Sequence, residues 1–308
     1  MKNTITAIII FSTLLLTAAC SSDSAAEQND KPNLVVTTTF INDMVSVLED
    51  GADGFNTEMI IPAGEDPHIY EPKASDLRVL GNADLTLYHG LNFEGRLGDV
   101  LEEGISVTEG FNENSIKEMQ EENETAADPH FWFDISLYKQ AFTKVKDTLI
   151  EYNPKDSAVY EENFEAYIRE LDELKLFAAS RISEIPEDSR ILVTPHDAFG
   201  YLADSYDLEV HAPQGFSTDS EVSNNQIQKT AELIIENNIK AVFAETTTNP
   251  DRMARLQEIV ASAGGQVEVI AGDGKELLSD SLAPKGDIGD TYLSMYRHNI
   301  NTIADHLK

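Results

Sequence analysis

Two short segments of the sequence place a histidine directly after a proline, with an aromatic residue two positions later. Residues 66–70 read Asp-Pro-His-Ile-Tyr, and residues 128–132 read Asp-Pro-His-Phe-Trp. The proline ring fixes φ, so it stiffens the backbone that presents the following imidazole. Neutral imidazole is the commonest side-chain metal ligand in proteins, and it suits Zn²⁺, Fe²⁺ and related ions. The repeated pattern therefore predicts a transition-metal site that includes His68 and His130.

A third histidine, His196, has a similar setting in the second half of the chain. It follows Pro195, directly after a strand of buried type that is expected over residues 190–194. His68 also lies beyond the end of an expected strand, over residues 57–61. Because open α/β sheets bind ligands at the carboxyl ends of their strands, these histidines are expected to converge on one cleft. Taken singly, each histidine is more typical of a loop or helix-cap residue than of a metal ligand. The Pro-His setting that all three share makes the metal-ligand interpretation as good as the loop or cap interpretation.

The elements that must position these side chains alternate between strand-like and helical patterns. Expected strands cover residues 34–39, 57–61, 83–88, 190–194, 208–211, 241–245 and 267–271. Expected helices cover residues 41–48, 75–80, 136–152, 198–205, 225–237, 250–263 and 291–307. Such alternation is typical of an α/β fold with parallel sheets. Asn249 before Pro250 supplies an N-cap and a first-turn proline, and Asp290 is the expected N-cap of the last helix.

The segment from Asn153 to about Ile185 differs from both halves, because its pattern predicts one long amphipathic helix. Apolar residues recur at steps of three and four positions and form one stripe, which comprises Tyr160, Phe164, Tyr167, Leu171 and Leu174. Some thirty residues at 1.5 Å each make a helix of roughly 45 Å, long enough to span two domains. The alternative is a pair of shorter helices with a break near Ala178.

The N-terminal residues have the pattern of an export signal. Lys2 precedes an apolar run over residues 5–16 that ends in small residues and Cys20, the only cysteine of the chain. Such a run is short for a membrane span and typical of a secretory signal. A lone cysteine forms no internal disulfide, so lipid attachment is its expected use. The small residues before Cys20 resemble a bacterial lipobox, although Thr17 stands where leucine is usual. The alternative is a plain signal peptide with an incidental cysteine.

Composition limits the partners of the chain. Of 308 residues 41% are hydrophobic, which is enough for a substantial core. The 55 acidic and 22 basic residues give a formal net charge of −33. Such a surface repels nucleic acid and anionic lipid and attracts cations only diffusely, so the charge excludes partners without identifying a ligand.

Several longer stretches carry a specific resemblance. The chain resembles the solute-binding lipoproteins of manganese and zinc ABC importers in the stretches IIPAGEDPHIYEPKASDL, ADLTLYHGLNFE, DPHFWFD, TPHDAFGYLADSYDLEV, QGFSTDSE, VFAETTTNP and LLSDSLAPKGDIGDTYLSMYRHNI. These motifs occur in the order of the family, from about residue 33 to the C-terminus. The resemblance therefore covers nearly the whole chain after the export signal.

The resemblance implies a fold and a set of boundaries. The fold is α/β with two lobes, each a parallel-sheet βα sandwich, joined by one long rigid helix and with the ligand cleft between the lobes. Together with the residue patterns above, it gives these boundaries: a signal peptide at 1–19, a lipidated tether at 20–32, an N-terminal metal-binding lobe at 33–152, a linking helix at 153–186 and a C-terminal metal-binding lobe at 187–308.

The resemblance also implies the ligands of one divalent metal ion. Matched position by position, His68 and His130 are the first-lobe ligands, and His196 and Asp280 are the second-lobe ligands. Glu245, at the end of an expected strand, is a candidate for a carboxylate that orients a metal-bound imidazole. The family pattern uses none of the remaining histidines as a ligand, namely His89, His211, His298 and His306.

Three features bear on which metal is bound. Related manganese binders often carry Glu where His196 stands, which favours zinc. The zinc branch commonly has a His-rich loop before the second ligand, whereas residues 109–127 contain no histidine, which favours manganese. The sequences of the motifs are also closer to the manganese branch. Mn²⁺ is therefore the expected ion, narrowly ahead of Zn²⁺, and Fe²⁺ is a further candidate. Zn²⁺ is expected to bind more tightly than Mn²⁺ in either case.

The function that follows is that of an extracytoplasmic receptor and not of an enzyme. The expected partners are an ABC importer permease with its cytoplasmic ATPase, and a bacterial membrane through a lipid on Cys20; the protein is expected to be a monomer that binds no nucleic acid. One alternative is a secreted metallohydrolase, but such an enzyme keeps a water position that Asp280 would close. Another is a surface adhesin of the same fold, which explains none of the histidines. The Gly274-Lys275 pair lacks the spacing of a P-loop ATPase.

Overall fold

The structure is a computed structural model, and it describes residues 31–121, 124–219 and 221–308. The expected signal peptide, Cys20 and nearly all of the expected tether lie outside the described residues. Residues Lys31–Lys308 cluster as one compact unit. Within the described part of the chain, no helix is both long and apolar enough to cross a membrane.

The first lobe is built on a four-stranded parallel sheet. The strand order is β2 (Asn56–Met59), β1 (Asn33–Val36), β3 (Leu85–Tyr88) and β4 (Ile105–Ser106), and all three pairings are parallel. The helices of this lobe are α1 (Thr39–Leu48), α2 (Ala74–Gly81) and α3 (Ile135–Tyr152). Leu34, Val35 and Val36 of the central strand β1 are buried, as expected of a strand covered on both faces.

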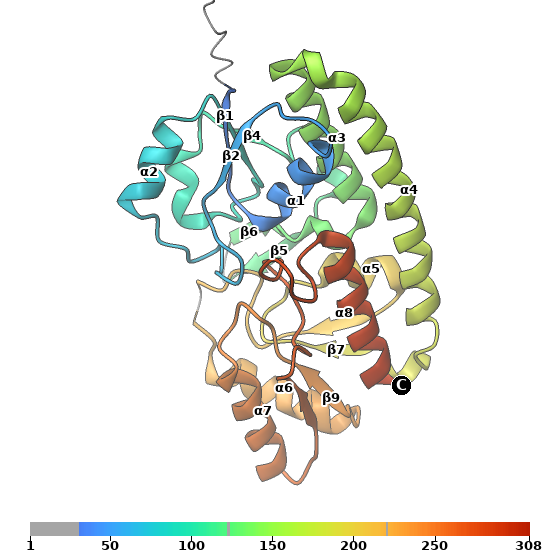
Figure 1. Cartoon of the computed structure of the whole chain (residues 1–308). Coiled ribbons are helices and arrows are strands. Elements are labelled where there is room, and N and C mark those ends of the chain that lie inside the picture. Colours follow the sequence, from blue (N-terminus) through green and yellow to red (C-terminus); the bar gives the residue numbers. More distant parts are fainter. Residues whose placement is uncertain (1–30, 122–123, 220) are drawn as a thin grey trace, which may run out of the picture. The chain divides into compact units, whose positions relative to one another are not determined.

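The second lobe repeats the βα pattern. Strand β7 (Ile191–Val193) pairs in parallel with β8 (Glu209–His211), and β9 (Ala241–Phe243) pairs in parallel with β10 (Glu268–Ile270). Strand β7 also packs beside β9. The helices of this lobe are α5 (Gly200–Tyr206), α6 (Asn224–Glu236), α7 (Asp251–Ser262) and α8 (Tyr292–Leu307). The two lobes therefore have the α/β character that the alternating pattern predicts (Figure 1).

One helix packs against both lobes. Helix α4 (Ser157–Ile182) has 26 residues and contacts α1 and α3 of the first lobe and α8 of the second. It passes through Ala178 without a break, so the alternative of two shorter helices is wrong. Its length corresponds to about 39 Å, and a short 3₁₀ turn, Pro154–Asp156, precedes it. The buried side chains of its stripe are Tyr160, Tyr167, Leu171, Leu174, Ala178 and Ile182.

Other expectations differ from the structure in detail. An antiparallel hairpin, β5 (Glu118–Glu121) with β6 (Glu124–Ala127), lies in a segment for which no strand is expected. Its residues are mostly acidic or small and lack the apolar alternation that signals a strand. The N-cap of α8 is Thr291, whose hydroxyl accepts a hydrogen bond from the Ser294 N–H at 3.3 Å. Asp290, the expected N-cap, accepts instead from the Gly286 N–H at 2.8 Å.

The core ties the two lobes together directly after the second Asp-Pro-His motif, residues 128–130. The Tyr292 hydroxyl of α8 donates to the Trp132 carbonyl at 2.7 Å, and the Trp132 indole N–H donates to the Ser279 carbonyl at 2.9 Å. The Tyr296 hydroxyl donates to the Phe133 carbonyl at 2.9 Å. The segment after His130 is therefore fixed directly to α8 and to the loop that precedes it.

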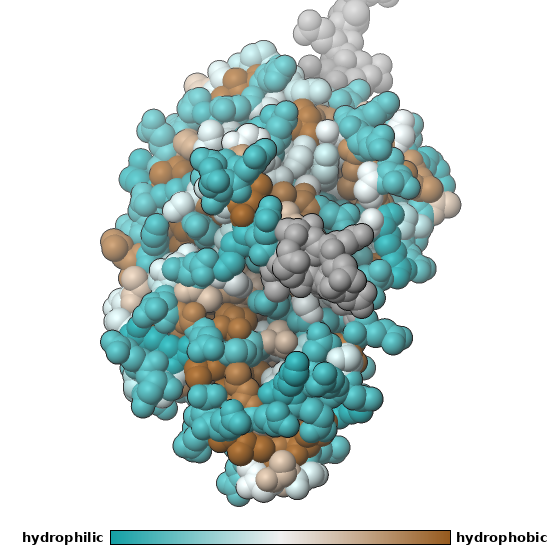
Figure 2. All heavy atoms as spheres, turned by 180° about the vertical axis from the view of Figure 1, so that it is seen from behind, coloured by the Kyte–Doolittle hydropathy of each residue, from teal (hydrophilic) through white to brown (hydrophobic). Residues whose placement is uncertain are grey.

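In contrast to the apolar core, the surface of the protein is mainly hydrophilic. On the face opposite that of Figure 1, hydrophilic side chains cover most of the molecule, and hydrophobic side chains gather chiefly in its lower half (Figure 2). This agrees with the excess of 55 acidic over 22 basic residues in the whole sequence. The apolar residues of the chain thus serve mainly the core that positions the site.

Candidate metal centre

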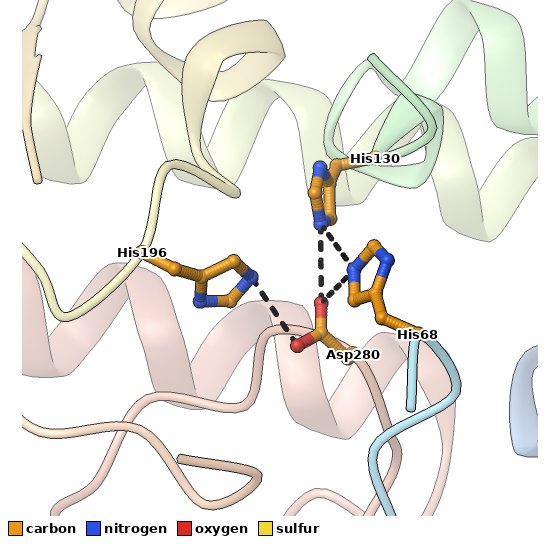
Figure 3. A group of neighbouring side chains, drawn as sticks. All are labelled: His68, His130, His196 and Asp280. Carbon is orange, nitrogen blue, oxygen red and sulfur yellow. Dashed lines mark hydrogen bonds and ion pairs between the residues drawn. The ribbon is translucent and has the colours of Figure 1, made fainter. Parts of the chain in front are cut away.

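Four side chains from both lobes meet at one buried point. His68, His130, His196 and Asp280 each offer one ligand atom, and these atoms all lie within 4.8 Å of one another. His68 is 4% exposed and the other three residues are 0% exposed. Figure 3 shows the three imidazoles arranged around the carboxylate of Asp280. The structure thus brings together all four residues that the resemblance implies as ligands.

The separations within this group suit a metal ion. His130 Nε2 lies 3.4 Å from His68 Nε2 and 3.2 Å from Asp280 Oδ1. His196 Nε2 lies 3.3 Å from Asp280 Oδ2, and His68 Nε2 lies 4.0 Å from Asp280 Oδ1. With metal–ligand bonds of about 2.1 Å, the ligand atoms of a tetrahedral site are roughly 3.4 Å apart. The side chains are therefore spaced almost as a bound ion requires.

The two Asp-Pro-His turns share one hydrogen bond to the backbone but differ in the hydrogen bonds between side chains. In each, the aspartate Oδ1 accepts from the backbone N–H of the histidine at 3.0 Å. Asp128 Oδ1 also lies 2.7 Å from His130 Nδ1, so it fixes the orientation of that ring. In contrast, Asp66 Oδ2 accepts from the Thr218 hydroxyl of the second lobe at 2.5 Å. The role of Asp128 was not expected from the sequence, although the repeated motif contains it.

His196 is oriented by a carboxylate in the same manner as His130. Its Nδ1 lies 2.5 Å from Oε2 of Glu245, which is 2% exposed at the carboxyl end of β9. With the proton on Nδ1, the lone pair of Nε2 points toward the other three residues. Glu245 is thus placed as expected of a carboxylate that orients an imidazole.

Burial and the neighbouring charges shift the pKa values of all four side chains. Burial lowers the pKa of His68 to about 3, so this imidazole is neutral. For His130, burial also lowers the pKa, but the hydrogen bond to Asp128 and the attraction of Asp280 outweigh it and raise the value to about 9. The pKa of His196 lies well above its usual value, because Asp280 and Glu245 outweigh burial. Burial would raise the pKa of Asp280, but attraction to His196 and His130 holds it well below its usual value.

Two atoms of the group have unused hydrogen-bonding capacity. His196 Nε2 and Asp280 Oδ1 are buried, and neither makes a hydrogen bond within the described residues. A buried polar atom without a partner is costly, so such atoms are usually satisfied by a ligand. Both atoms face the point at which the four side chains meet, and a cation there would satisfy them.

The other four histidines do not belong to this group. His89 is buried against Phe93 and Trp132, and its Nδ1 lies 3.2 Å from the Thr38 hydroxyl. The remaining three pair elsewhere: His211 with Glu209, His298 with the Glu276 carbonyl and His306 with the Thr302 carbonyl. The structure thus separates the four expected ligands from the histidines that were not expected to bind metal.

Known proteins share this sequence and this fold. "Manganese-binding lipoprotein MntA" of Bacillus subtilis is 33% identical over 315 residues, which cover 100% of both chains. "Zinc-binding protein TroA" of Treponema pallidum is 33% identical over 287 residues, which cover 92% of this chain and 91% of TroA. A solved TroA structure is 50% identical, with a TM-score of 0.88 over 90% of this chain and 100% of TroA.

A family model gives the same result over most of the chain. The model for ZnuA, described as zinc-uptake complex component A, periplasmic, matches residues 34–306. This range contains nearly all of both lobes, helix α4 and all four converging side chains. The two-lobed α/β fold expected from the resemblance is the fold of this solved TroA structure. The chain is a member of the ZnuA family.

Proposed function

We propose that this protein is an extracytoplasmic receptor that captures one divalent transition-metal ion and delivers it to an ABC importer. The observation that carries the proposal is the buried group of three imidazoles and one carboxylate, drawn from both lobes. Membership of the ZnuA family supports it, as do relatives that are manganese-binding and zinc-binding proteins.

The ligands of the ion are His68 and His130 from the first lobe and His196 and Asp280 from the second. We propose that the first lobe covers residues 33–152 and the second covers 187–308, with residues 153–186 linking them. Because each lobe supplies two ligands, a bound ion cross-links the lobes. Asp128 and Glu245 hold the Nδ1 sides of His130 and His196, so that both Nε2 atoms face the ion.

The ligand set accepts several borderline ions. Three nitrogen atoms and a carboxylate suit Zn²⁺, Mn²⁺ and Fe²⁺. Zn²⁺ binds such a site more tightly than Mn²⁺. We propose Mn²⁺ as the preferred cargo, narrowly ahead of Zn²⁺, because residues 109–127 contain no histidine and MntA is a manganese-binding relative.

The receptor delivers its ion to a permease that is driven by a cytoplasmic ATPase. We propose that a lipid on Cys20 anchors the protein to the bacterial membrane and that the receptor acts as a monomer. A catalytic role is not proposed, because Asp280 fills the ligand position that a hydrolytic zinc ion keeps for water. No observation favours the adhesin alternative.

The His130→Ala variant tests the proposed ligands. Loss of one of four ligands from a buried site should weaken the binding of Mn²⁺ and of Zn²⁺ by at least about a hundredfold. Titration calorimetry measures both affinities, and circular dichroism checks that the fold is retained. The His211→Ala variant, which changes a half-buried histidine outside the group, should bind both ions like the wild type. Wild-type affinity of the His130→Ala variant would show that the ligand assignment is wrong.

A further inference from the structure

The two oxygens of the Asp280 carboxylate have different surroundings. Oδ1 lies 3.2 Å from His130 Nε2 and makes no hydrogen bond within the described residues. Oδ2 lies 3.3 Å from His196 Nε2 and also accepts a hydrogen bond from the Thr247 hydroxyl at 3.0 Å. Both oxygens therefore lie beside an imidazole, but only Oδ2 also accepts a hydrogen bond from the Thr247 hydroxyl.

The neighbouring hydroxyls leave Thr247 as the donor to Oδ2. Ser279 Oγ lies 3.0 Å from Glu245 Oε2 and 3.3 Å from Asp280 Oδ2. A hydroxyl has one proton, so the shorter contact assigns the Ser279 proton to Glu245. Thr247 Oγ1 lies 3.2 Å from Ser279 Oγ and 3.0 Å from Asp280 Oδ2, which assigns its proton to Asp280. Each hydroxyl thus serves a different carboxylate of the site.

The backbone holds Thr247 in this position. The segment after β9 runs parallel to the segment that leads to Asp280, through a bridge between Glu245 and Leu277. The Thr246 N–H donates to the Leu277 carbonyl at 3.0 Å. The side chain of Asp280 and the residue that binds its second oxygen therefore lie on adjacent, paired segments of the second lobe.

We propose that Thr247 determines metal specificity, because its hydroxyl controls how far the second oxygen of Asp280 can contribute to the bound ion. This inference rests on the proposed function. A hydrogen bond to Oδ2 withdraws electron density from that oxygen and favours a carboxylate that binds through Oδ1 alone. The result is a four-coordinate N₃O site, which suits Zn²⁺. Mn²⁺ prefers a higher coordination number and more oxygen ligands, so it would benefit more from both oxygens.

The Thr247→Val variant tests this role. Valine has the shape of threonine without the hydroxyl, so it frees Oδ2. We expect the ratio of the dissociation constants for Mn²⁺ and Zn²⁺ to fall by about tenfold, the effect of losing one hydrogen bond to a charged group. Competition titrations with a chelator measure both constants. X-ray absorption of the Mn²⁺-loaded protein should show an additional oxygen in the coordination shell.

Two matched variants make the result specific. Thr247→Ser keeps a hydroxyl at the site and should retain the wild-type ratio, whereas Thr246→Val makes the same chemical change at an exposed neighbour and should alter neither constant. An unchanged ratio in Thr247→Val, or a parallel change of both constants, would overturn the inference. The proposed function would survive that result as long as His130→Ala loses both ions, and it would fail only if His130→Ala retains them.

Discussion

At the scale of single residues, the repeated Asp-Pro-His motif performs two tasks. In both copies the aspartate accepts from the backbone N–H of the histidine. In the second copy the aspartate also orients its own imidazole, whereas in the first it accepts from Thr218 of the other lobe. His130 is consequently oriented by a charge, and no such carboxylate bond to His68 Nδ1 is seen among the described residues. One sequence motif thus serves ligand orientation in one place and contact between lobes in the other.

The Asp128→Asn variant should weaken metal binding without loss of the fold. An amide oxygen can still accept from the His130 N–H, but it removes the negative charge beside Nδ1. We expect the dissociation constant for Mn²⁺ to rise by about ten- to a hundredfold, the usual effect of losing a carboxylate that orients a ligand. Titration calorimetry measures it. The matched control is Glu209→Gln, which alters the exposed pair with His211 and should leave the affinity unchanged. Equal affinities for all three proteins would contradict this account.

The affinity for metal should depend on pH in a defined direction. Without an ion, the raised pKa values of His130, about 9, and of His196 keep both imidazoles protonated at neutral pH. A metal ion needs both Nε2 lone pairs, so its binding must release about one to two protons. Affinity should therefore rise as the pH rises from 6 toward 9. Calorimetry in buffers of different ionisation enthalpy measures the protons released, and an affinity that is constant between pH 6 and 8 would contradict the pKa assignments.

At the scale of elements, the sequence predicts local features better than contacts between segments. The buried strands and the amphipathic stripe of α4 are visible as apolar patterns, and three ligands are marked by the preceding proline. Asp280 carries no such mark, because its position depends on the pairing of the Leu277 segment with the end of β9, far away in the sequence. Only the family resemblance distinguishes Asp280 from nearby aspartates. The hairpin of β5 and β6 is not predicted from the sequence, because its strands lack alternation of apolar and polar residues.

The loop between β8 and α6 connects the lobes beside the site. Its Thr218 donates to Asp66 at 2.5 Å, and its Asp219 pairs with Arg96 at 2.9 Å. Asp66 is buried, whereas the Arg96–Asp219 pair is exposed. A buried hydrogen bond to a carboxylate contributes more than an exposed ion pair, so the Thr218 bond should be the stronger of the two connections.

The Thr218→Val variant should release metal faster. Loss of its hydrogen bond leaves Asp66 without its partner in the second lobe and weakens the contact between the lobes next to His68. We expect the dissociation rate of the ion to rise by about tenfold, with little change in the association rate. Stopped-flow mixing of the loaded protein with a chelator measures the dissociation rate. Arg96→Ala, the comparison variant, should change it much less, and equal effects of the two variants would show that the loop does not act through Asp66.

At the scale of the whole molecule, Asp43 joins the two lobes to helix α4. This residue of α1 is 8% exposed. Its Oδ2 accepts from the Tyr292 N–H at the start of α8 at 3.0 Å and from the Tyr167 hydroxyl of α4 at 3.5 Å. Burial raises the pKa of Asp43 to about 6, although these two hydrogen bonds oppose the shift. The carboxylate is therefore held in a place that favours its protonated form.

The Asp43→Asn variant should change how stability depends on pH. Because the folded-state pKa exceeds the ordinary value of 3.8, the contribution of Asp43 to stability is present in full below about pH 4 and is lost as the pH rises through 6. Asparagine resembles the protonated form, so the variant should be more stable than the wild type at pH 7 by about 1–3 kcal/mol. Urea unfolding of the metal-free protein at pH 4.5, 6 and 7 measures this. A variant with the same pH dependence as the wild type would show that Asp43 does not titrate in this range.

The central claim is that a single ion bridges the two lobes through His68, His130, His196 and Asp280. A crystal structure of the Mn²⁺-loaded protein, with anomalous data collected at an energy where manganese scatters strongly, tests it most directly. The account predicts one strong anomalous peak about 2.0–2.3 Å from the three Nε2 atoms and from at least one oxygen of Asp280. A peak bound by side chains of one lobe only, or one located away from these four residues, would contradict it.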